Sequence, residues 1–337
     1  MADRADHIAA FLAQAGWAKA SRRPLAGDAS FRRFERLSLG ARRAVLMVAP
    51  PPHENVDAFH RVERLLLTLG LNAPRPLAVD PAAGLMLLED FGDRTFTRAL
   101  AEGADEWALY ELAVDVLIDL HARADAAALA AEPWPDYDDE RLLAEAVLLT
   151  DWYLPALRGA ATPAAVREAY VAAWLDVFPL ARRIPSTLVL RDYHVDNLMV
   201  LDGRPGVAGC GLLDFQDAVI GPRSYDLMSL LEDARRDIPA DLVAAMLARY
   251  LAAFPGIDPA AFRASYAILG AQRNAKIIGI FTRLCRRDGK DQYLRHIPRV
   301  WRLLEGDLTA SELAPVRAWF DEVVPPAERR VPSAVAA

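Results

Sequence analysis

Two acidic residues and one amide residue carry the clearest chemical signal in the sequence. Asp192 stands five residues before Asn197, and Asp214 follows Asp192 by 22 residues, inside an apolar run. Transfer of a phosphoryl group needs a carboxylate that orients the attacking hydroxyl and accepts its proton. It also needs oxygen ligands for a Mg²⁺ ion that neutralises charge on the transferred group. We therefore expect Asp192 to be the catalytic base, and Asn197 and Asp214 to bind Mg²⁺.

Short apolar runs indicate how these residues are positioned. Residues 187–190 are typical of a strand that leads into the loop containing Asp192. Residues 198–201 and 211–213 are typical of two further strands, joined by turn residues at 202–206. The acids would then flank a small hairpin. The alternative is that they only cap turns, but the agreement of spacing and strand context favours the catalytic role.

Composition excludes several other classes of protein. The chain has 337 residues and is 53% apolar, which is enough for two lobes with a large core. Its net charge of −7 argues against nucleic acid as a partner. Cys210 and Cys285 are the only cysteines, too few for a disulfide framework or a zinc site, so a reducing cytoplasm fits best. No apolar run of about eighteen residues is present, so no membrane segment is expected.

The motifs resemble those of the aminoglycoside phosphotransferase branch of the protein-kinase-like fold. Residues 190–197 and 212–217 carry the resemblance, together with Tyr225-Asp226-Leu227. It implies that Asp226 braces the catalytic loop by hydrogen bonds, which is a structural role. The chain departs from the branch at Leu190, where a His is usual.

The resemblance also implies an α+β fold with two lobes. The N-terminal lobe would hold an antiparallel sheet and the C-terminal lobe would be mostly helical. We expect residues 1–90 to form the nucleotide-binding lobe and residues 91–327 to carry the catalytic loop and the substrate-binding helices. Residues 328–337 are expected to form a tail.

ATP is the expected phosphoryl donor, and the lobe boundary near Leu88-Glu89-Asp90-Phe91-Gly92 would bind its adenine through backbone groups, with Glu89 among the nucleotide-binding residues. Residues 27–34 occupy the place of the phosphate-binding loop, and we expect Ser30 and either Arg32 or Arg33 to contact the nucleotide. Although residues 90–92 spell a kinase metal motif, they precede the catalytic loop and are rejected for that role.

The strand at residues 45–48 lacks the Lys that a kinase normally directs at the phosphates. Met47 occupies that position, and Glu63 stands where the partner of that Lys would be, although it could equally be an exposed helix acid. Arg32 or Arg33 could replace the missing charge, because a guanidinium offers paired donors to phosphate. The alternative is a nucleotide-binding regulator without turnover, but the retained base and metal ligands favour an active enzyme.

Four further segments resemble the bacterial anomeric kinases of N-acetylmuramate and N-acetylglucosamine. These segments are residues 29–34, 49–52, 150–154 and 272–281. The resemblance covers about residues 5–305, and that family tolerates a residue other than Lys on the strand. It implies transfer of the γ-phosphate of ATP to the C1 hydroxyl of an amino sugar in peptidoglycan recycling. Aminoglycosides and other small alcohols are the rival substrates.

Candidate substrate contacts are less sharply defined. Residues 270–302 contain nine Lys or Arg and two Asp, and Arg273 with Lys276 could attract the carboxylate of N-acetylmuramate. A solvated helix face is the alternative. Trp152 and Tyr153 could stack on a sugar ring or pack between helices. Asp217 could bind a substrate hydroxyl or brace the metal-binding loop.

Overall fold

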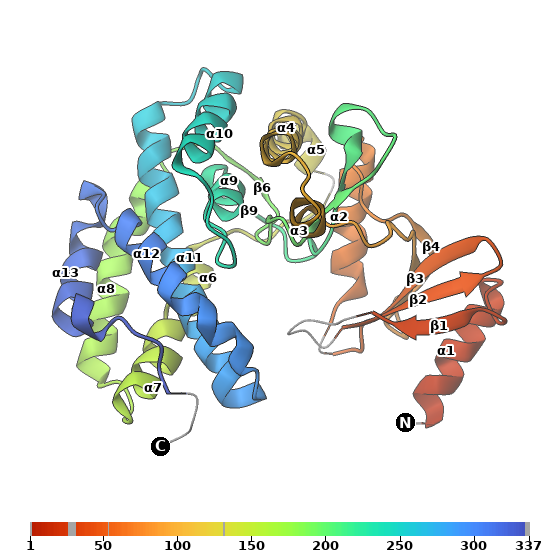
Figure 1. The fold of residues 1–337 in the computed structure, drawn as a ribbon, viewed down its shortest axis with the longest axis horizontal. Coiled ribbons are helices and arrows are strands. Elements are labelled where there is room, and N and C mark those ends of the chain that lie inside the picture. Colours follow the sequence, from red (N-terminus) through yellow and green to blue (C-terminus); the bar gives the residue numbers. More distant parts are fainter. Residues whose placement is uncertain (1, 26–31, 53, 131, 334–337) are drawn as a thin grey trace. The chain divides into compact units, whose positions relative to one another are not determined.

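The computed structural model describes residues 2–25, 32–52, 54–130 and 132–333 (Figure 1). The chain folds into two compact units. The first unit consists of residues 1–123, 130–132 and 195–218. The second consists of residues 124–129, 133–194 and 219–337. The chain therefore passes from one unit to the other just after Asp192, and returns just after Asp214.

The first unit is built on a five-stranded antiparallel sheet with the strand order β1-β2-β3-β5-β4. Its strands are β1 (Ser21–Pro24), β2 (Arg33–Leu39), β3 (Arg42–Val48), β4 (Pro76–Asp80) and β5 (Leu85–Leu88). Helix α1 (Ala2–Gln14) covers one face, where Phe11 packs in the same core as Leu37 and Leu46. Figure 1 shows α1 running along this sheet.

Strand alternation turns a second set of side chains to the opposite face of the sheet. Phe34 lies across the ladder from Met47, and Arg36 lies across from Val45. Helix α2 (Val56–Thr68) follows this sheet segment and begins at Asn55. The Asn55 side chain accepts hydrogen bonds from the backbone N–H groups of Asp57 and Ala58 at 2.9 and 3.2 Å, which satisfies donors that a helix start leaves open.

The rest of the first unit holds two helices and a hairpin. The helices are α3 (Phe96–Ala101) and α4 (Glu106–Arg123). The hairpin pairs β7 (Leu198–Val200) with β8 (Cys210–Leu212), and a short 3₁₀ turn, η2 (Gly206–Gly209), stands between them. A Cβ at Gly211 would lie 2.8 Å from the Phe91 ring, so glycine lets this hairpin approach residues 90–92 closely.

The second unit is mainly helical. Its longer helices are α6 (Asp139–Ala146), α8 (Ala164–Ala181), α9 (Ser224–Leu231), α10 (Ala240–Ala253), α11 (Pro259–Asp288), α12 (Ile297–Asp307) and α13 (Ala314–Val323). Its shorter ones are α5 (Ala126–Leu129), η1 (Leu149–Tyr153), α7 (Leu154–Arg158), η3 (Asp291–His296), η4 (Ser311–Leu313) and η5 (Pro326–Glu328). Strands β6 (Ser186–Val189) and β9 (Val219–Pro222) pair antiparallel.

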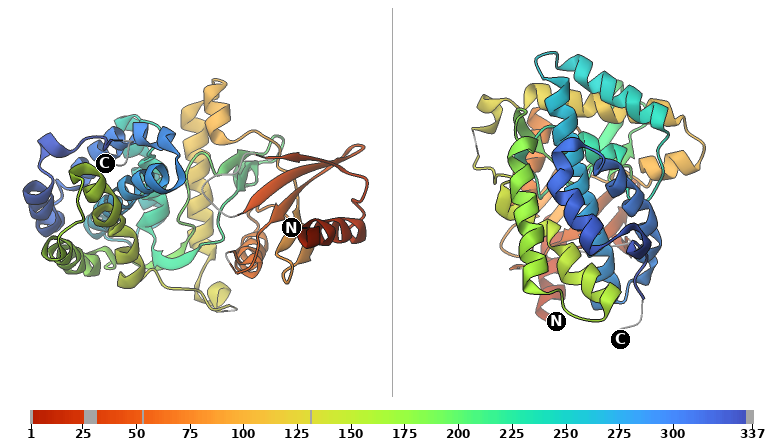
Figure 2. Two further views of the ribbon diagram at one scale, coloured as in Figure 1. Left: turned by 90° about the horizontal axis from the view of Figure 1, so that it is seen from below. Right: turned by 90° about the vertical axis from the view of Figure 1, so that its left-hand side faces the viewer.

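Helix α11 is the centre of the second unit, and it packs against α6, η1, α8, α9 and α12. Figure 2 shows α11 within this bundle. The helix begins at Pro259, after Asp258 caps the N–H of Ala260 at 3.0 Å, and it ends before Gly289 at φ 67°. A Cβ at Gly279 would lie 2.3 Å from the backbone of Leu148, so α11 can approach η1 this closely only with glycine there.

Most elements expected from the sequence are present. The hairpin at residues 198–213 is confirmed. The compact units group α4 and residues 195–218 with the sheet, so the lobe boundary at residues 90/91 stays a prediction. None of the helices in the described ranges is long and apolar enough to cross a membrane.

The described part of the expected tail is held in place. Arg329 is 7% exposed and pairs with Glu305 and Asp321, each at 2.9 Å. The backbone carbonyl of Arg330 accepts a hydrogen bond from the Tyr153 hydroxyl at 2.8 Å. Residues 329 and 330 therefore belong to the packed part of the second unit.

Candidate active site

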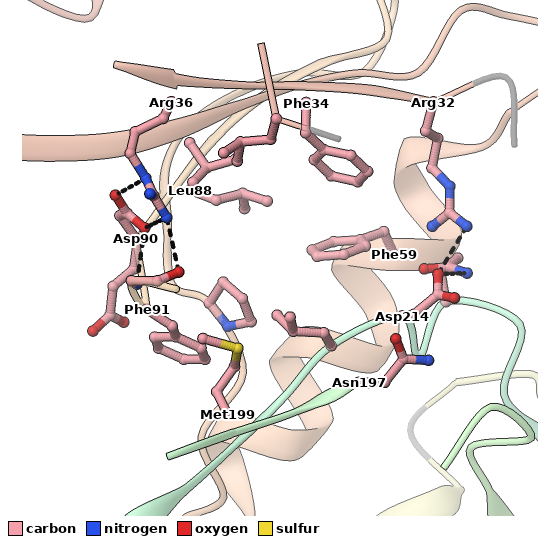
Figure 3. Close-up of a pocket in the computed structure, with 17 residues that line it drawn as sticks. Arg32, Phe34, Arg36, Phe59, Leu88, Asp90, Phe91, Asn197, Met199 and Asp214 are labelled. Carbon is pink, nitrogen blue, oxygen red and sulfur yellow. Dashed lines mark hydrogen bonds and ion pairs between the residues drawn. The ribbon is translucent and has the colours of Figure 1, made fainter. Parts of the chain in front are cut away.

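A cavity of about 320 Å³ opens on the face of the sheet opposite α1. Figure 3 shows the side chains that line it. All of them belong to the first unit: Leu25, Arg32, Phe34, Arg36, Val45, Phe59, Pro74, Leu88, Glu89, Asp90, Phe91, Gly92, Asn197, Met199, Leu213, Asp214 and Gln216. The sheet, α2, residues 88–92 and the hairpin each supply part of the lining.

The cavity has an apolar middle and two charged ends. Figure 3 shows Arg32, Asp214 and Asn197 at one end, and Arg36 with Asp90 at the other. Apolar side chains lie between them, among them Phe34, Leu88, Phe91 and Met199. An apolar cavity with a few convergent polar groups is typical of a site for a small ligand.

Arg32 and Asp214 form an ion pair at one end of the cavity. The Nη2 atom of Arg32 lies 2.9 Å from Oδ1 of Asp214, and its Nε atom lies 3.5 Å from Oε2 of Glu54. Gln216 also donates from Nε2 to Oδ1 of Asp214, at 3.0 Å. Asp214 adopts a φ of 58°, which only a few residues other than glycine tolerate, so the chain turns sharply there after β8.

The hairpin brings Asn197 and Asp214 to the same cavity, as the sequence predicted. Asn197 directly precedes β7, and its carbonyl accepts a hydrogen bond from the N–H of Leu213 at 2.9 Å. This bond extends the ladder by one step, so the residue that follows it, Asp214, is set beside Asn197. Both side chains line the cavity wall.

The opposite end of the cavity was not anticipated from the sequence. Arg36 pairs with Asp90 and Asp93, each at 2.7 Å, and donates to the carbonyl of Gly92 at 2.8 Å. These contacts tie β2 to the segment at residues 90–93. A signal existed, because Phe34 and Arg36 alternate along β2 and share a face, and Arg32 directly before the strand continues the same alternation. Glu89 lines the cavity as expected, and its Oε1 atom lies 3.2 Å from Arg204.

The strand position without a lysine is apolar and buried. Met47 is 1% exposed and carries no charge to the cavity face of the sheet. Glu63 is also buried, at 1% exposure, and lies 3.0 Å from Nδ1 of His60. The interpretation of Glu63 as an exposed helix acid is therefore wrong. Burial raises the pKa of Glu63, although the His60 contact opposes that shift.

Other nucleotide-site candidates lie outside the cavity wall or outside the described residues. Ser30 falls in the undescribed range 26–31. Arg33 is exposed, and alternation along β2 points it away from the cavity face that carries Arg32. Asp217 is exposed as well, and its Oδ2 atom accepts a hydrogen bond from Gln216 at 3.0 Å. Gln216 thus joins Asp217 to Asp214.

Asp192 belongs to the second unit, in the loop that follows β6. The expected brace is confirmed there, because Asp226 accepts the N–H groups of Leu190 at 2.6 Å and Arg191 at 2.9 Å. Asp226 is completely buried, which raises its pKa to about 7 against the effect of these two bonds. The side chain of His194 is 7% exposed, and burial lowers its pKa.

Three candidate substrate contacts also lie in the second unit. Tyr153 is completely buried and packs edge-on against Trp301 at 5.6 Å, which favours packing over sugar stacking. Trp152 is half-buried in the same π-helical turn. Arg273 is 5% exposed and donates to the carbonyl of Glu232 at 3.3 Å. The solvated-face interpretation is therefore wrong for Arg273.

The interpretation of the basic segment as a solvated helix face is wrong for Lys276 as well. Its side chain is 13% exposed, and its Nζ atom lies 3.0 Å from Glu145 on α6. Helical spacing correctly grouped Arg273 with Lys276, but it could not show which elements cover that face. The two charges therefore serve internal contacts of the second unit.

Comparisons with known proteins agree with this architecture. The chain matches the model of the phosphotransferase enzyme family over residues 21–264. It is 38% identical to the N-acetylmuramate/N-acetylglucosamine kinase of Caulobacter vibrioides, over 96% of this chain and 97% of that one. It is 41% identical to the enzyme of the same name from Pseudomonas aeruginosa, over 84% and 82% of the two chains.

Solved structures show the same fold at low sequence identity. The choline kinase LicA from Streptococcus pneumoniae superposes with a TM-score of 0.63 at 13% identity, covering 91% of this chain and 99% of that one. An ADP-bound aminoglycoside phosphotransferase superposes with a TM-score of 0.56 at 16% identity, covering 90% and 97%. The α+β, protein-kinase-like fold expected from the sequence is confirmed. The chain belongs to the phosphotransferase enzyme family, and within it groups with the N-acetylmuramate/N-acetylglucosamine kinases.

Proposed function

We propose that the protein is an ATP-dependent kinase that phosphorylates the anomeric C1 hydroxyl of N-acetylmuramate and N-acetylglucosamine in peptidoglycan recycling. The observation that carries this proposal is the 38% identity to the Caulobacter vibrioides kinase over 96% of this chain. The cavity of the first unit supports it, because its apolar middle and charged end suit a nucleotide. An amino sugar is the expected partner in a cytoplasmic reaction, without nucleic acid or membrane.

The nucleotide would lie along the cavity with its base among the apolar side chains. Phe34, Leu88 and Phe91 provide apolar surface against which a purine can pack. Its phosphates would extend toward Arg32, which supplies the positive charge that Met47 lacks. A guanidinium can donate two parallel hydrogen bonds to phosphate oxygens, so Arg32 can replace a lysine here. The ion pair with Asp214 keeps Arg32 oriented into the cavity before nucleotide binds.

Asn197 and Asp214 fit a Mg²⁺ ion. Both line the same end of the cavity, and they offer the amide and carboxylate oxygens that Mg²⁺ prefers. Few protein ligands are needed, because Mg²⁺ in such sites takes its other ligands from phosphates and water. When bound, the ion neutralises charge on the transferred group. Gln216 would hold Asp214 in place through its hydrogen bond to Oδ1.

Asp192 would orient the anomeric hydroxyl and accept its proton. The Asp226 brace fixes the backbone just before Asp192, so the carboxylate has a defined direction. A positioned base of this kind contributes about 10²–10⁴-fold to a rate. Substrate contacts from Asp217, Arg273, Trp152 and Tyr153 stay predictions.

Two alternatives remain distinct from this proposal. One is phosphorylation of an aminoglycoside or another small alcohol, since one fold serves many substrates. The other is a nucleotide-binding regulator without turnover, suggested by Met47. Retention of Asp192, Asn197 and Asp214 supports turnover over the regulator.

A single assay separates the three functions. The protein is incubated with ATP and Mg²⁺ and, in separate samples, with N-acetylmuramate, N-acetylglucosamine, an aminoglycoside and choline. The products are examined by phosphorus NMR. We expect both amino sugars to give a 1-phosphate, whose phosphorus couples to the C1 proton. A 6-phosphate, or a phosphorylated aminoglycoside with both amino sugars unchanged, would overturn the proposal. ATP binding with no product from any acceptor would support the regulator.

A further inference from the structure

The residue before the proposed base has a strained backbone. The N–H of Asp192 donates to the carbonyl of Leu190 at 2.9 Å, which closes a three-residue turn around Arg191. Arg191 adopts a φ of 71° at its centre. A residue with a Cβ resists this conformation, because the Cβ crowds the neighbouring carbonyl oxygen. The turn therefore persists only if the surrounding groups hold it.

The main chain of the turn is held by α9. Asp226 accepts the N–H groups of Leu190 and Arg191, and Ser229 donates to the carbonyl of Arg191 at 3.3 Å. These bonds fix the peptide groups on either side of Arg191. They would form equally well around a glycine, so they do not explain why an arginine occupies the strained position.

The Arg191 side chain is held separately, by Glu145 on α6. Its Nη2 atom pairs with Oε1 of Glu145, and its guanidinium lies over the ring of Tyr137 at 5.6 Å. The side chains of Arg191 and Glu145 are 21% and 12% exposed. The guanidinium is therefore largely removed from water, and it pairs with the carboxylate of Glu145.

Glu145 is itself fixed by three further donors. Lys276 on α11 lies 3.0 Å from Oε1, the Tyr137 hydroxyl donates to Oε2 at 2.6 Å, and Gln272 donates to Oε2 at 3.2 Å. Burial alone would raise the pKa of Glu145, but Lys276 and Arg191 outweigh it and hold the pKa at about 2. Glu145 is thus a charged anchor tied to two helices.

We propose that Glu145 is a positioning residue for phosphoryl transfer: by holding the Arg191 guanidinium, it keeps the strained turn closed and so sets the direction of Asp192. The proposal rests on the proposed role of Asp192 as the base. Stability alone gives no reason to keep these charges, because apolar residues of similar volume often replace a buried ion pair without loss. A role in fixing the turn beside the base gives such a reason.

The first test compares two substitutions of Arg191. Glycine adopts a positive φ without crowding, whereas alanine keeps the strain and loses the anchor. We expect Arg191→Gly to keep kcat within about threefold of the wild type, and Arg191→Ala to lower kcat about tenfold or more, the range that backbone strain represents. The KM for ATP should stay unchanged in both, because the nucleotide cavity lies in the first unit. Equal losses in kcat for the two variants would overturn the proposal.

The second test measures coupling between the two residues. Glu145→Gln should lower kcat about tenfold or more in the wild-type background. In the Arg191→Gly background it should lower kcat no further, because the turn no longer depends on the anchor. A purely structural role would instead give the same loss in both backgrounds, and that result would overturn the proposal. The control is Glu140→Gln, an exposed acid on the same helix, which should leave kcat unchanged.

Two further variants keep the test decisive. Glu145→Gln leaves Arg191 and Lys276 without their shared carboxylate and could unfold the second unit. Glu145→Gln/Lys276→Met restores the net charge of the group, and it should fold and still show the loss in kcat. If that protein also fails to fold, the comparison of Arg191→Gly with Arg191→Ala decides. If Asp192→Asn keeps its activity, Asp192 is not the base and the proposed function of this site is wrong. If Asp192→Asn is inactive while Glu145→Gln is fully active, Asp192 stays the proposed base and only the positioning role of Glu145 is refuted.

Discussion

Arg191 and Asp214 are the two residues other than glycine that adopt a positive φ in the described ranges. Arg191 precedes the proposed base, and Asp214 is a proposed ligand of Mg²⁺. Their surroundings differ in exposure and in partners. The side chain of Arg191 is 21% exposed and pairs with Glu145, which is 12% exposed. The side chain of Asp214 is 40% exposed and pairs with Arg32, which is 11% exposed.

The comparison separates a side chain with a fixed partner, Arg191, from one that can exchange its partner for a ligand, Asp214. Arg191 cannot leave Glu145 without stranding a largely buried charge, which is strongly unfavourable. Asp214 is the exposed member of its pair, so that contact is worth less than a buried one. Arg32 lies close to a second carboxylate, that of Glu54, so Asp214 can turn to a ligand in the cavity without leaving the guanidinium uncompensated. We infer that the direction of Asp192 is set before any ligand binds, whereas the phosphate end of the cavity is completed by the ligand.

The largest expected effect comes from removing the carboxylate on the exchangeable side. Asp214→Ala should lower kcat about 10³-fold or more, because a metal ligand supports several kcal/mol of charge stabilisation in the transition state. It should also abolish the Mg²⁺ dependence of ATP binding. Titration calorimetry with ATP, with and without Mg²⁺, measures this directly. Asn197→Ala should be nearly as damaging.

A matched control is available on the same hairpin. Asp202 has a 76% exposed side chain in the turn after β7 and pairs with Arg94, so Asp202→Ala should leave kcat and ATP binding unchanged. If Asp214→Ala binds Mg-ATP as the wild type does, Asp214 is not a metal ligand. Replacement of the Arg32–Asp214 ion pair by ligand contacts would then play no part in catalysis.

The next effect breaks the fixed side of the comparison. Asp192→Asn should keep the fold and the ATP affinity but lower kcat about 10²-fold or more, as expected for loss of a positioned base. Steady-state kinetics with N-acetylmuramate measures kcat, and the melting temperature reports the fold. Turnover within threefold of the wild type would show that Asp192 is not the base.

Local spacing explains why part of the site could be predicted from the sequence. Asp192, Asn197 and Asp214 lie in one short segment, and the apolar runs between them predict the hairpin that sets Asn197 beside Asp214. The Asp226 brace was predicted from the family resemblance alone. The antiparallel sheet of the N-terminal lobe was likewise implied by the resemblance, and the apolar run at residues 45–48 predicted one of its strands.

Long-range partners explain why the rest could not be predicted. Glu145 lies 46 residues from Arg191 and 131 from Lys276, and no local pattern connects them. The basic face of α11 was visible from its spacing, but its burial depends on elements far away in the chain.

A smaller effect on ligand binding concerns the missing lysine. Arg32→Ala should raise the KM for ATP, because a charge-assisted hydrogen bond contributes about 1.5–3 kcal/mol, or roughly 10- to 100-fold. Arg33→Ala is the matched control, since Arg33 is exposed and absent from the cavity lining, and its KM should match the wild type. ATP saturation curves for the two variants decide the assignment. Wild-type kinetics for Arg32→Ala would mean that another group, or none, binds the phosphates.

The smallest effect concerns stability, and it sharpens the contrast between buried carboxylates whose burial is fully and only partly compensated by neighbouring groups. Glu232 and Asp307 are both buried in the second unit, and Asn274 donates to each, at 2.8 and 3.0 Å. Burial raises the pKa of Glu232 from 4.5 to about 7, because Asn274 and Arg273 compensate it only in part, and burial beside Glu232 raises the pKa of Asp307 as well. The pKa of Glu145 is lowered instead, because Lys276 and Arg191 lie beside it.

The sign of the pH dependence follows from these shifts. Between pH 4.5 and 7 the unfolded chain has released the Glu232 proton while the folded protein retains it. The free energy of unfolding should therefore fall as pH rises through this window, by about 1.4 kcal/mol per pH unit for one proton. Glu145 adds nothing to this slope from about pH 5 upward, because it is then ionised in both states. Urea unfolding at pH 5, 6 and 7 should give a flatter dependence for Glu232→Gln than for the wild type. Parallel curves for the two proteins would show that Glu232 is already ionised in the folded state, and that Asn274 and Arg273 are enough to keep its buried carboxylate charged.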